Sequence, residues 1–107
     1  MKLKSNRELD RWISVMVFHN EVDNEDGSLI EHNIHGSQPL PNYTSDMNSA
    51  VKVLSSINGY LEYQGYEEVL WCASMDYATF YPTYHKNPAM AICLAACKLY
   101  TGEDWGN

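Results

Sequence analysis

Three histidines and five acidic residues lie close together in the first half of the chain. His19, His32 and His35 flank a stretch that contains five carboxylates, namely Glu21, Asp23, Glu25, Asp26 and Glu31. Imidazole and carboxylate groups are common ligands of transition metals. A weak metal-dependent enzyme that uses this stretch is therefore one function to consider.

The spacing of these residues matches neither of the two metal motifs that they suggest. His32 and His35 are three residues apart, whereas the zincins use a His-Glu-x-x-His helix. An EF-hand register with Gly27 at position 6 places Val22, which has no carboxylate, at position 1. We therefore predict a solvated polar loop, with no metal and no cofactor.

Nucleophilic catalysis is no better supported. The sequence has no Gly-x-Ser-x-Gly elbow and no Gly-rich phosphate loop with a lysine. Cys72 and His85 are a conceivable Cys–His pair, but Cys72 lies in an apolar strand, where a thiolate is disfavoured. Cys93 and Cys97 are four residues apart in an apolar helical pattern, which indicates two small buried residues. We expect no catalytic residue, so the chain is not predicted to be an enzyme.

Polar and aromatic residues in two regions are better candidates for binding. The first region precedes a predicted helix, where hydroxyl groups can cap the free backbone N–H groups of the first turn. The same N–H groups could bind a phosphate, although the negative charge of Asp46 would repel it. The second is a set of tyrosines around predicted strands, because exposed tyrosine favours interfaces. The candidate ligand or interface residues are Tyr43, Thr44, Ser45, Tyr63, Tyr66, Tyr77, Tyr81 and Tyr84.

Helical periodicity predicts two helices in the first 60 residues. The first runs from Asn6 to Val17 and begins with a capping box of Ser5 and Glu8. The second starts after a Thr44 or Ser45 cap and stops at Asn58-Gly59. Its predicted buried stripe is Met47, Ala50, Val51, Leu54 and Ile57.

A third helix is predicted after Asn87, with Pro88 at its first position and Gly102 at its end. Its residues from 89 to 97 are mostly small and apolar, which indicates burial on more than one side, against a sheet alone or a sheet and a partner subunit.

The segments between the helices favour strands. Short runs rich in aromatic and β-branched residues at 60–63, 69–73 and 77–81 predict antiparallel strands. Residues 18–43 are either irregular or a hairpin that turns at Asp26-Gly27. We therefore predict one α+β domain over residues 1–107. It is a small sandwich of about three helices on an antiparallel sheet, with 18–43 as an insertion.

Charge and hydropathy narrow the classes of partner. The chain has 14 acidic and 7 basic residues, a net charge of −7, and no basic cluster. Nucleic acid is therefore not an expected partner. No apolar run approaches the roughly 20 residues of a membrane span, and no apolar segment follows the first lysines as a signal peptide would require. We expect a cytoplasmic protein with no membrane contact.

Three segments together resemble the phage α-β-α sandwich domain family, a group of small and mostly uncharacterised phage and prophage proteins. They are Arg7-Glu8-Leu9-Asp10, the Pro41-Asn42-Tyr43-Thr44-Ser45-Asp46 group, and Pro88 to Ala96 with its Ala-Ile-Cys core. The resemblance spans about residues 6–102. It departs in the order of Thr44 and Ser45, and nothing matches between Val22 and Gln38. It implies no catalytic residues, and it implies the cytoplasm of a bacterial host cell as the location.

These observations predict a non-catalytic binding protein that modulates a host factor, because an acidic surface and exposed tyrosines suit a basic protein partner. An alternative is an oligomeric binder of a nucleotide defence signal, for which Arg11, Lys86 and Lys98 are the sparse positive candidates. Self-association as a homodimer or higher oligomer is expected, through the third helix and the tyrosine-rich sheet.

Overall fold

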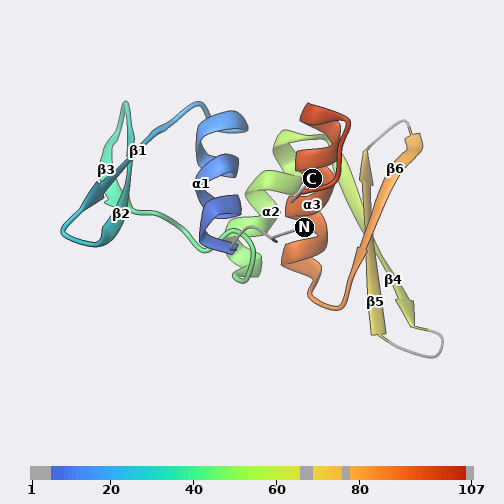
Figure 1. Ribbon diagram of the computed structural model, residues 1–107. Helices are drawn as coiled ribbons and strands as arrows, with labels where there is room; N and C mark the ends of the chain where they lie inside the picture. The colour runs from blue at the N-terminus through green and yellow to red at the C-terminus, as the bar shows by residue number, and fades with distance from the viewer. Residues whose placement is uncertain (1–5, 66–68, 76–77, 106–107) are drawn as a thin grey trace.

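The computed structural model describes residues 6–65, 69–75 and 78–105, and it places them in three helices and two antiparallel sheets (Figure 1). The helices are α1 (Asn6–Met16), α2 (Met47–Ser56) and α3 (Pro88–Thr101). Sheet A contains β1 (Glu21–Glu25), β2 (Ser28–Asn33) and β3 (Gly36–Pro39). Sheet B contains β4 (Gly59–Gly65), β5 (Val69–Met75) and β6 (Ala78–His85). The predicted α+β class, with three helices and an antiparallel sheet, is confirmed.

The helices form a central layer with one sheet on each side. Sheet A lies beside α1 and sheet B lies beside α3, at opposite ends of the molecule in Figure 1. The buried apolar side chains form a single cluster that runs from Val22 in sheet A, through Leu9 and Ile13 of α1, to Ile92 of α3. Sheet A is therefore packed on the helices through a continuous core.

The third helix is buried within its own chain. It packs against α2, against β5 and β6 of sheet B, and more lightly against α1. Its small residues are the buried ones, namely Ala89, Ala91, Cys93, Ala95, Ala96 and Cys97. The prediction of burial on more than one side is confirmed. Neighbouring elements of the same chain cover these small residues, and self-association through this helix stays an untested prediction.

The ends of α3 agree with the prediction. The Asn87 side chain accepts a hydrogen bond from the Ala89 N–H at 2.9 Å, and Pro88 occupies the first turn. Gly102 ends the helix with φ 76°, a left-handed conformation that glycine adopts without a Cβ clash. The predicted end of α1 is off by one residue, and its proposed cap Ser5 lies outside the described residues. Across the described ranges, no helix is long and apolar enough to cross a membrane.

The cap of α2 differs from the prediction. Asp46, and neither Thr44 nor Ser45, has the extended backbone of an N-cap, and its carboxylate accepts hydrogen bonds from Asn48 N–H and Ser49 Oγ. Thr44 does not cap the helix. It is buried, and its backbone N–H donates a hydrogen bond to Asp10 of α1 at 2.8 Å.

The buried stripe of α2 also shifts relative to the prediction. Val53 is fully buried, whereas Val51, predicted to be buried, is 47% exposed. Ala50 and Ile57 are buried as predicted. The helix stops where predicted, although Asn58, with φ 50°, supplies the left-handed residue in place of Gly59.

Sheet A forms from the segment predicted to be irregular or a hairpin. Asp26 and Gly27 both have positive φ, as a two-residue hairpin turn of type I′ requires, and they place Glu25 opposite Ser28. The Gly27 N–H donates to Asn24 Oδ1 at 3.1 Å. The hairpin reading is therefore confirmed. The third strand, β3, was not predicted, because its exposed residues carry no apolar alternation.

A buried carboxylate attaches sheet A to α1. Glu31 of β2 is 1% exposed. Its Oε1 accepts hydrogen bonds from Ser14 Oγ at 2.6 Å and from Tyr43 Oη at 2.8 Å, and its Oε2 accepts one from Gln38 Nε2 at 2.6 Å. Burial by itself raises the pKa of Glu31, but the hydrogen bonds outweigh it, so the net pKa lies below the ordinary value of 4.5. The carboxylate is therefore held in its charged form.

A second buried carboxylate fixes the loop between the sheet and α2. Asp10 of α1, 1% exposed, accepts the Thr44 N–H on one oxygen and Arg7 Nη1 on the other, at 2.7 Å. The same guanidinium donates to the carbonyl oxygens of Leu40 and Pro41 at 3.0 and 3.2 Å. The chain from β3 to α2 is thereby bonded to the first two turns of α1.

The Glu31 network predicts a specific pH dependence of stability. Because the folded-state pKa of Glu31 is below its unfolded value, its contribution is present above about pH 4.5 and is lost as the pH falls through the folded pKa. Glu31→Gln should lower the free energy of unfolding in urea at pH 7 by about 1–3 kcal/mol, because it places an amide beside the Gln38 donor.

The difference between wild type and Glu31→Gln should shrink below pH 4, where the wild-type carboxyl also becomes neutral. Glu25→Gln, at an exposed position of the same sheet, is the matched control and should change stability by less than about 0.5 kcal/mol. A constant difference between wild type and Glu31→Gln from pH 7 to pH 3 would contradict this assignment.

The reassigned cap of α2 can be tested with two alanine substitutions. Asp46→Ala should destabilise the protein by about 1 kcal/mol in chemical denaturation, because it removes the acceptor of the Asn48 N–H. Ser45→Ala should be nearly neutral, since Ser45 is exposed and does not cap. The reverse order of the two effects would restore the original prediction.

Candidate functional site

The outer face of sheet A gathers the acidic residues of β1 beside a histidine of β2. Strand alternation directs Val22 and Glu31 toward the core, and so directs Glu21, Asp23 and Glu25 to the outer face. His32 is the cross-strand partner of Glu21, so it lies on this outer face too. All three acids are exposed.

His32 is oriented by hydrogen bonding on one side of its ring. Its Nδ1 lies 2.6 Å from Ser37 Oγ on β3, the residue directly opposite in the sheet. Its Nε2 lies 3.1 Å from Asp23 Oδ2. One ligand atom from each of Asp23, Glu25 and His32 can be chosen so that all three lie within 4.8 Å of one another. The arrangement can hold a cation or a positively charged side chain.

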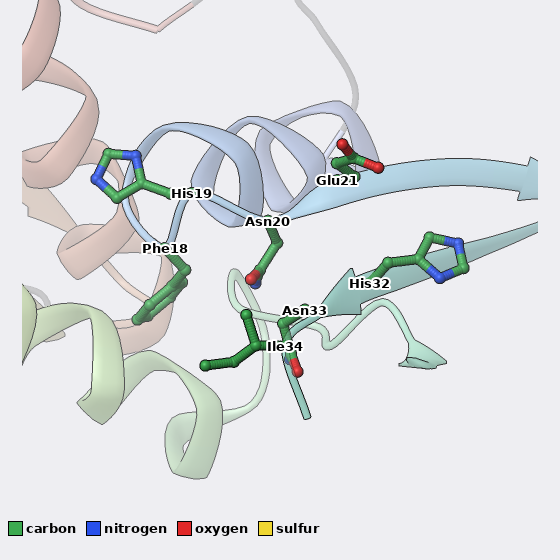
Figure 2. Close-up of a pocket in the computed structure, with 7 residues that line it drawn as sticks. All are labelled: Phe18, His19, Asn20, Glu21, His32, Asn33 and Ile34. Carbon is green, nitrogen blue, oxygen red and sulfur yellow. The ribbon is translucent and has the colours of Figure 1, made fainter. Parts of the chain in front are cut away.

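A hollow lies where β1 and β2 meet the end of α1, and Figure 2 shows the residues that line it. Its volume is about 450 Å³, and it is lined by Phe18, His19, Asn20, Glu21, His32, Asn33 and Ile34. His19 has φ 57°, in the left-handed region, where the chain leaves α1 and turns into β1. The hollow is of ligand-binding size, but no lysine or arginine is among its lining residues.

The three predicted histidines do not converge. The rings of His19 and His32 lie at opposite ends of the hollow in Figure 2. His35 lies in the turn after β2 and lines a separate hollow of about 130 Å³. Within the described part of the chain, the candidate metal group is made by His32 with two acids of the neighbouring strand. The stretch is therefore an ordered sheet, and the prediction of a solvated loop is wrong.

The first group of predicted binding residues is largely internal. Tyr43 and Thr44 are buried, and the Tyr43 ring stacks on Phe18 with 5.4 Å between ring centroids. Burial, followed by its hydrogen bond to Glu31, raises the pKa of Tyr43 well above its usual range. Ser45 is exposed. The side chains of Tyr43 and Thr44 therefore stabilise the loop, and they are not available to a surface partner.

The two tyrosine side chains that the structure describes in sheet B lie on opposite faces. Tyr63 and Tyr84 are about half exposed. Thr83 is bonded to the Ala91 carbonyl of α3, so its neighbour Tyr84 points to the opposite face by strand alternation. The register aligns Tyr63 with His85, and His85 is on the same face as Thr83 because the two are two residues apart. Tyr63 therefore lies on the face that carries α3. Tyr66 and Tyr77 lie outside the described residues, as does the side chain of Tyr81.

The cysteines that the structure describes have no nucleophilic environment. Cys93 and Cys97 are buried, as predicted. Burial, and then the negative charge of Asp10, raise the pKa of the Cys93 thiol far above its usual range. The side chain of Cys72 lies outside the described residues. A thiolate at Cys93 is therefore strongly disfavoured.

Two features of the sequence indicate the Glu31 and His32 clusters. Asp10 and Ser14 are four residues apart on the same face of α1 as Leu9 and Ile13, and buried polar residues in an apolar stripe indicate a hydrogen-bonded network. The Asp26-Gly27 turn, extended by strict antiparallel pairing, already places Glu21 opposite His32.

Comparison with known proteins identifies a fold and no family. No protein-family model matches the chain, and no curated protein matches it. Among solved structures, the chain is similar to a phage protein from Bacillus cereus ATCC 14579, known from a 2.0 Å crystal structure. The TM-score is 0.64 at 14% identity, and the match covers 91% of this chain and 88% of that one. The chain therefore shares the fold of a phage protein, and its resemblance to the phage α-β-α sandwich family is not confirmed.

Proposed function

We propose that this chain is a phage or prophage protein that acts without catalysis, by docking the outer face of sheet A onto a basic surface of a bacterial host protein. The observation that carries the proposal is the row of Glu21, Asp23 and Glu25 along β1, all exposed on the face that points away from the core. The fold shared with a phage protein supports the source.

Charge is concentrated in this sheet. Residues 21–39 contain five of the 14 acidic residues and no lysine or arginine. One of the five, Glu31, is buried, so the other four act on the surface. A cluster of one sign steers an oppositely charged partner and favours the correct orientation on encounter. The position of sheet A at one end of the molecule makes the row accessible (Figure 1).

The nucleotide-binding alternative has less support. A nucleotide phosphate needs positive groups or free backbone N–H groups, whereas the hollow in Figure 2 is bordered by Glu21 and by no lysine or arginine. A second hollow beside α1 and the C-terminal segment contains one predicted positive residue, Arg11, but Glu8 also lines it. Lys98, one of the predicted positive groups, is paired with Asp104 Oδ1 at 3.1 Å. We therefore favour a protein partner over a phosphorylated small molecule.

The docking proposal can be tested by neutralising the acidic row. Glu21→Gln with Glu25→Gln removes two charges from the outer face of sheet A. Partners captured from host lysate in the presence of EDTA, and quantified by mass spectrometry, should fall at least about tenfold relative to wild type. The wild-type capture should also weaken as salt rises from 50 to 300 mM, because exposed charges are screened.

A matched control has the same change of net charge elsewhere. Glu62→Gln with Glu103→Gln neutralises two exposed acids on sheet B and after α3, and it should leave capture unchanged. Equal losses in the two double variants would show a general charge effect. That result, or wild-type capture no higher than background, would overturn the proposal.

A further inference from the structure

One imidazole nitrogen on the outer face of sheet A is enclosed without a hydrogen bond. His32 Nε2 has almost no solvent-exposed surface and makes no hydrogen bond within the described chain. It lies 3.1 Å from Asp23 Oδ2, a contact that is an ion pair only when the imidazole is protonated. A positive charge between Nε2 and the carboxylate, either a proton on the ring or a metal ion, would stabilise this contact.

The second observation is the orientation of the ring. The other ring nitrogen of His32, Nδ1, is hydrogen-bonded to Ser37 Oγ at 2.6 Å. When Nδ1–H donates to this oxygen, Nε2 presents its lone pair to Asp23. Metal-binding histidines commonly use one ring nitrogen as the ligand while the other is held by a hydrogen bond, which fixes the ring.

The third observation is the charge of the cluster. Asp23 and Glu25 are two residues apart on one face of β1, so their carboxylates repel each other. With a neutral His32 they have a total charge of −2, which a divalent cation neutralises. We propose that His32, Asp23 and Glu25 bind one divalent transition-metal ion, with zinc as the best fit to one imidazole and two carboxylates.

The geometry permits this with small side-chain movements. Ligand atoms of a tetrahedral zinc site are about 3.4 Å apart, given metal–ligand distances near 2.1 Å. The three atoms here lie within 4.8 Å of one another, and Asp23 and Glu25 are exposed side chains that can rotate toward the ion. The side of the cluster that faces solvent leaves a coordination position for water. Magnesium is a poorer fit, because it prefers oxygen ligands.

The metal site shares Asp23 and Glu25 with the proposed docking face, but it needs no protein partner and is tested without one. It is tested on the untagged full chain by titration with ZnCl₂ in a calorimeter and by thermal unfolding. Zinc should bind with one-to-one stoichiometry. At about one hundred times its dissociation constant, it should raise Tm by roughly 5–15 °C. MgCl₂ at the same concentration should have little effect.

Two variants and two controls localise the effect. His32→Gln and Asp23→Asn should each weaken zinc binding at least about tenfold, whereas His19→Gln and His35→Gln should bind like wild type. Both affected variants retain the Glu21 and Glu25 charges used in the docking experiment, which contains EDTA, so the two proposals can fail separately. No saturable binding up to about 1 mM zinc, or undiminished binding in both His32→Gln and Asp23→Asn, would overturn the metal site.

Discussion

The structure depends on the placement of one charged carboxylate in the core. Removing Glu31 from water is costly, and the cost is offset because three donors reach its two oxygens at 2.6–2.8 Å. The donors come from α1, from β3 and from the loop before α2. One side chain thus joins the sheet, the first helix and the loop, while Asp10 bonds the same loop to α1.

This interaction determines which face of sheet A meets solvent. Side chains alternate along a strand, so a shift of register by one residue would exchange the two faces. Glu31 and Val22 fix the inner face, and the Asp26-Gly27 turn fixes the pairing. The acidic row of β1 and His32 are then directed outward as a consequence. The proposed docking surface and the proposed metal site both require that orientation.

Much of the fold could be predicted where local chemistry decides it. Asn87, Pro88 and Gly102 act on backbone groups within a few residues, so the limits of α3 could be identified from the sequence. The cap of α2 could not, because Thr44 is engaged by Asp10, a residue 34 positions away. The strand β3 has no apolar alternation of its own and forms on the open edge of β2.

The candidate site shows the same limit. His19, His32 and His35 are near one another in the sequence, which suggested a cluster of histidines. Strand pairing instead brings His32 close to Asp23 and Glu25. The tyrosines were expected on one exposed face. The register of sheet B places Tyr63 and Tyr84 on opposite faces. Tyr43 is buried and donates its hydroxyl hydrogen bond to Glu31. Residue type was informative, but the partner of each residue depended on pairing between strands.

If Glu31 holds sheet A against α1, its removal should loosen this end of the molecule alone. Hydrogen exchange of wild type and Glu31→Ala at pH 7, read by mass spectrometry, measures this loosening segment by segment. We expect faster exchange in residues 20–43 and in α1, with β4 to β6 unchanged. Unchanged exchange in residues 20–43, or an equal acceleration over the whole chain, would contradict it.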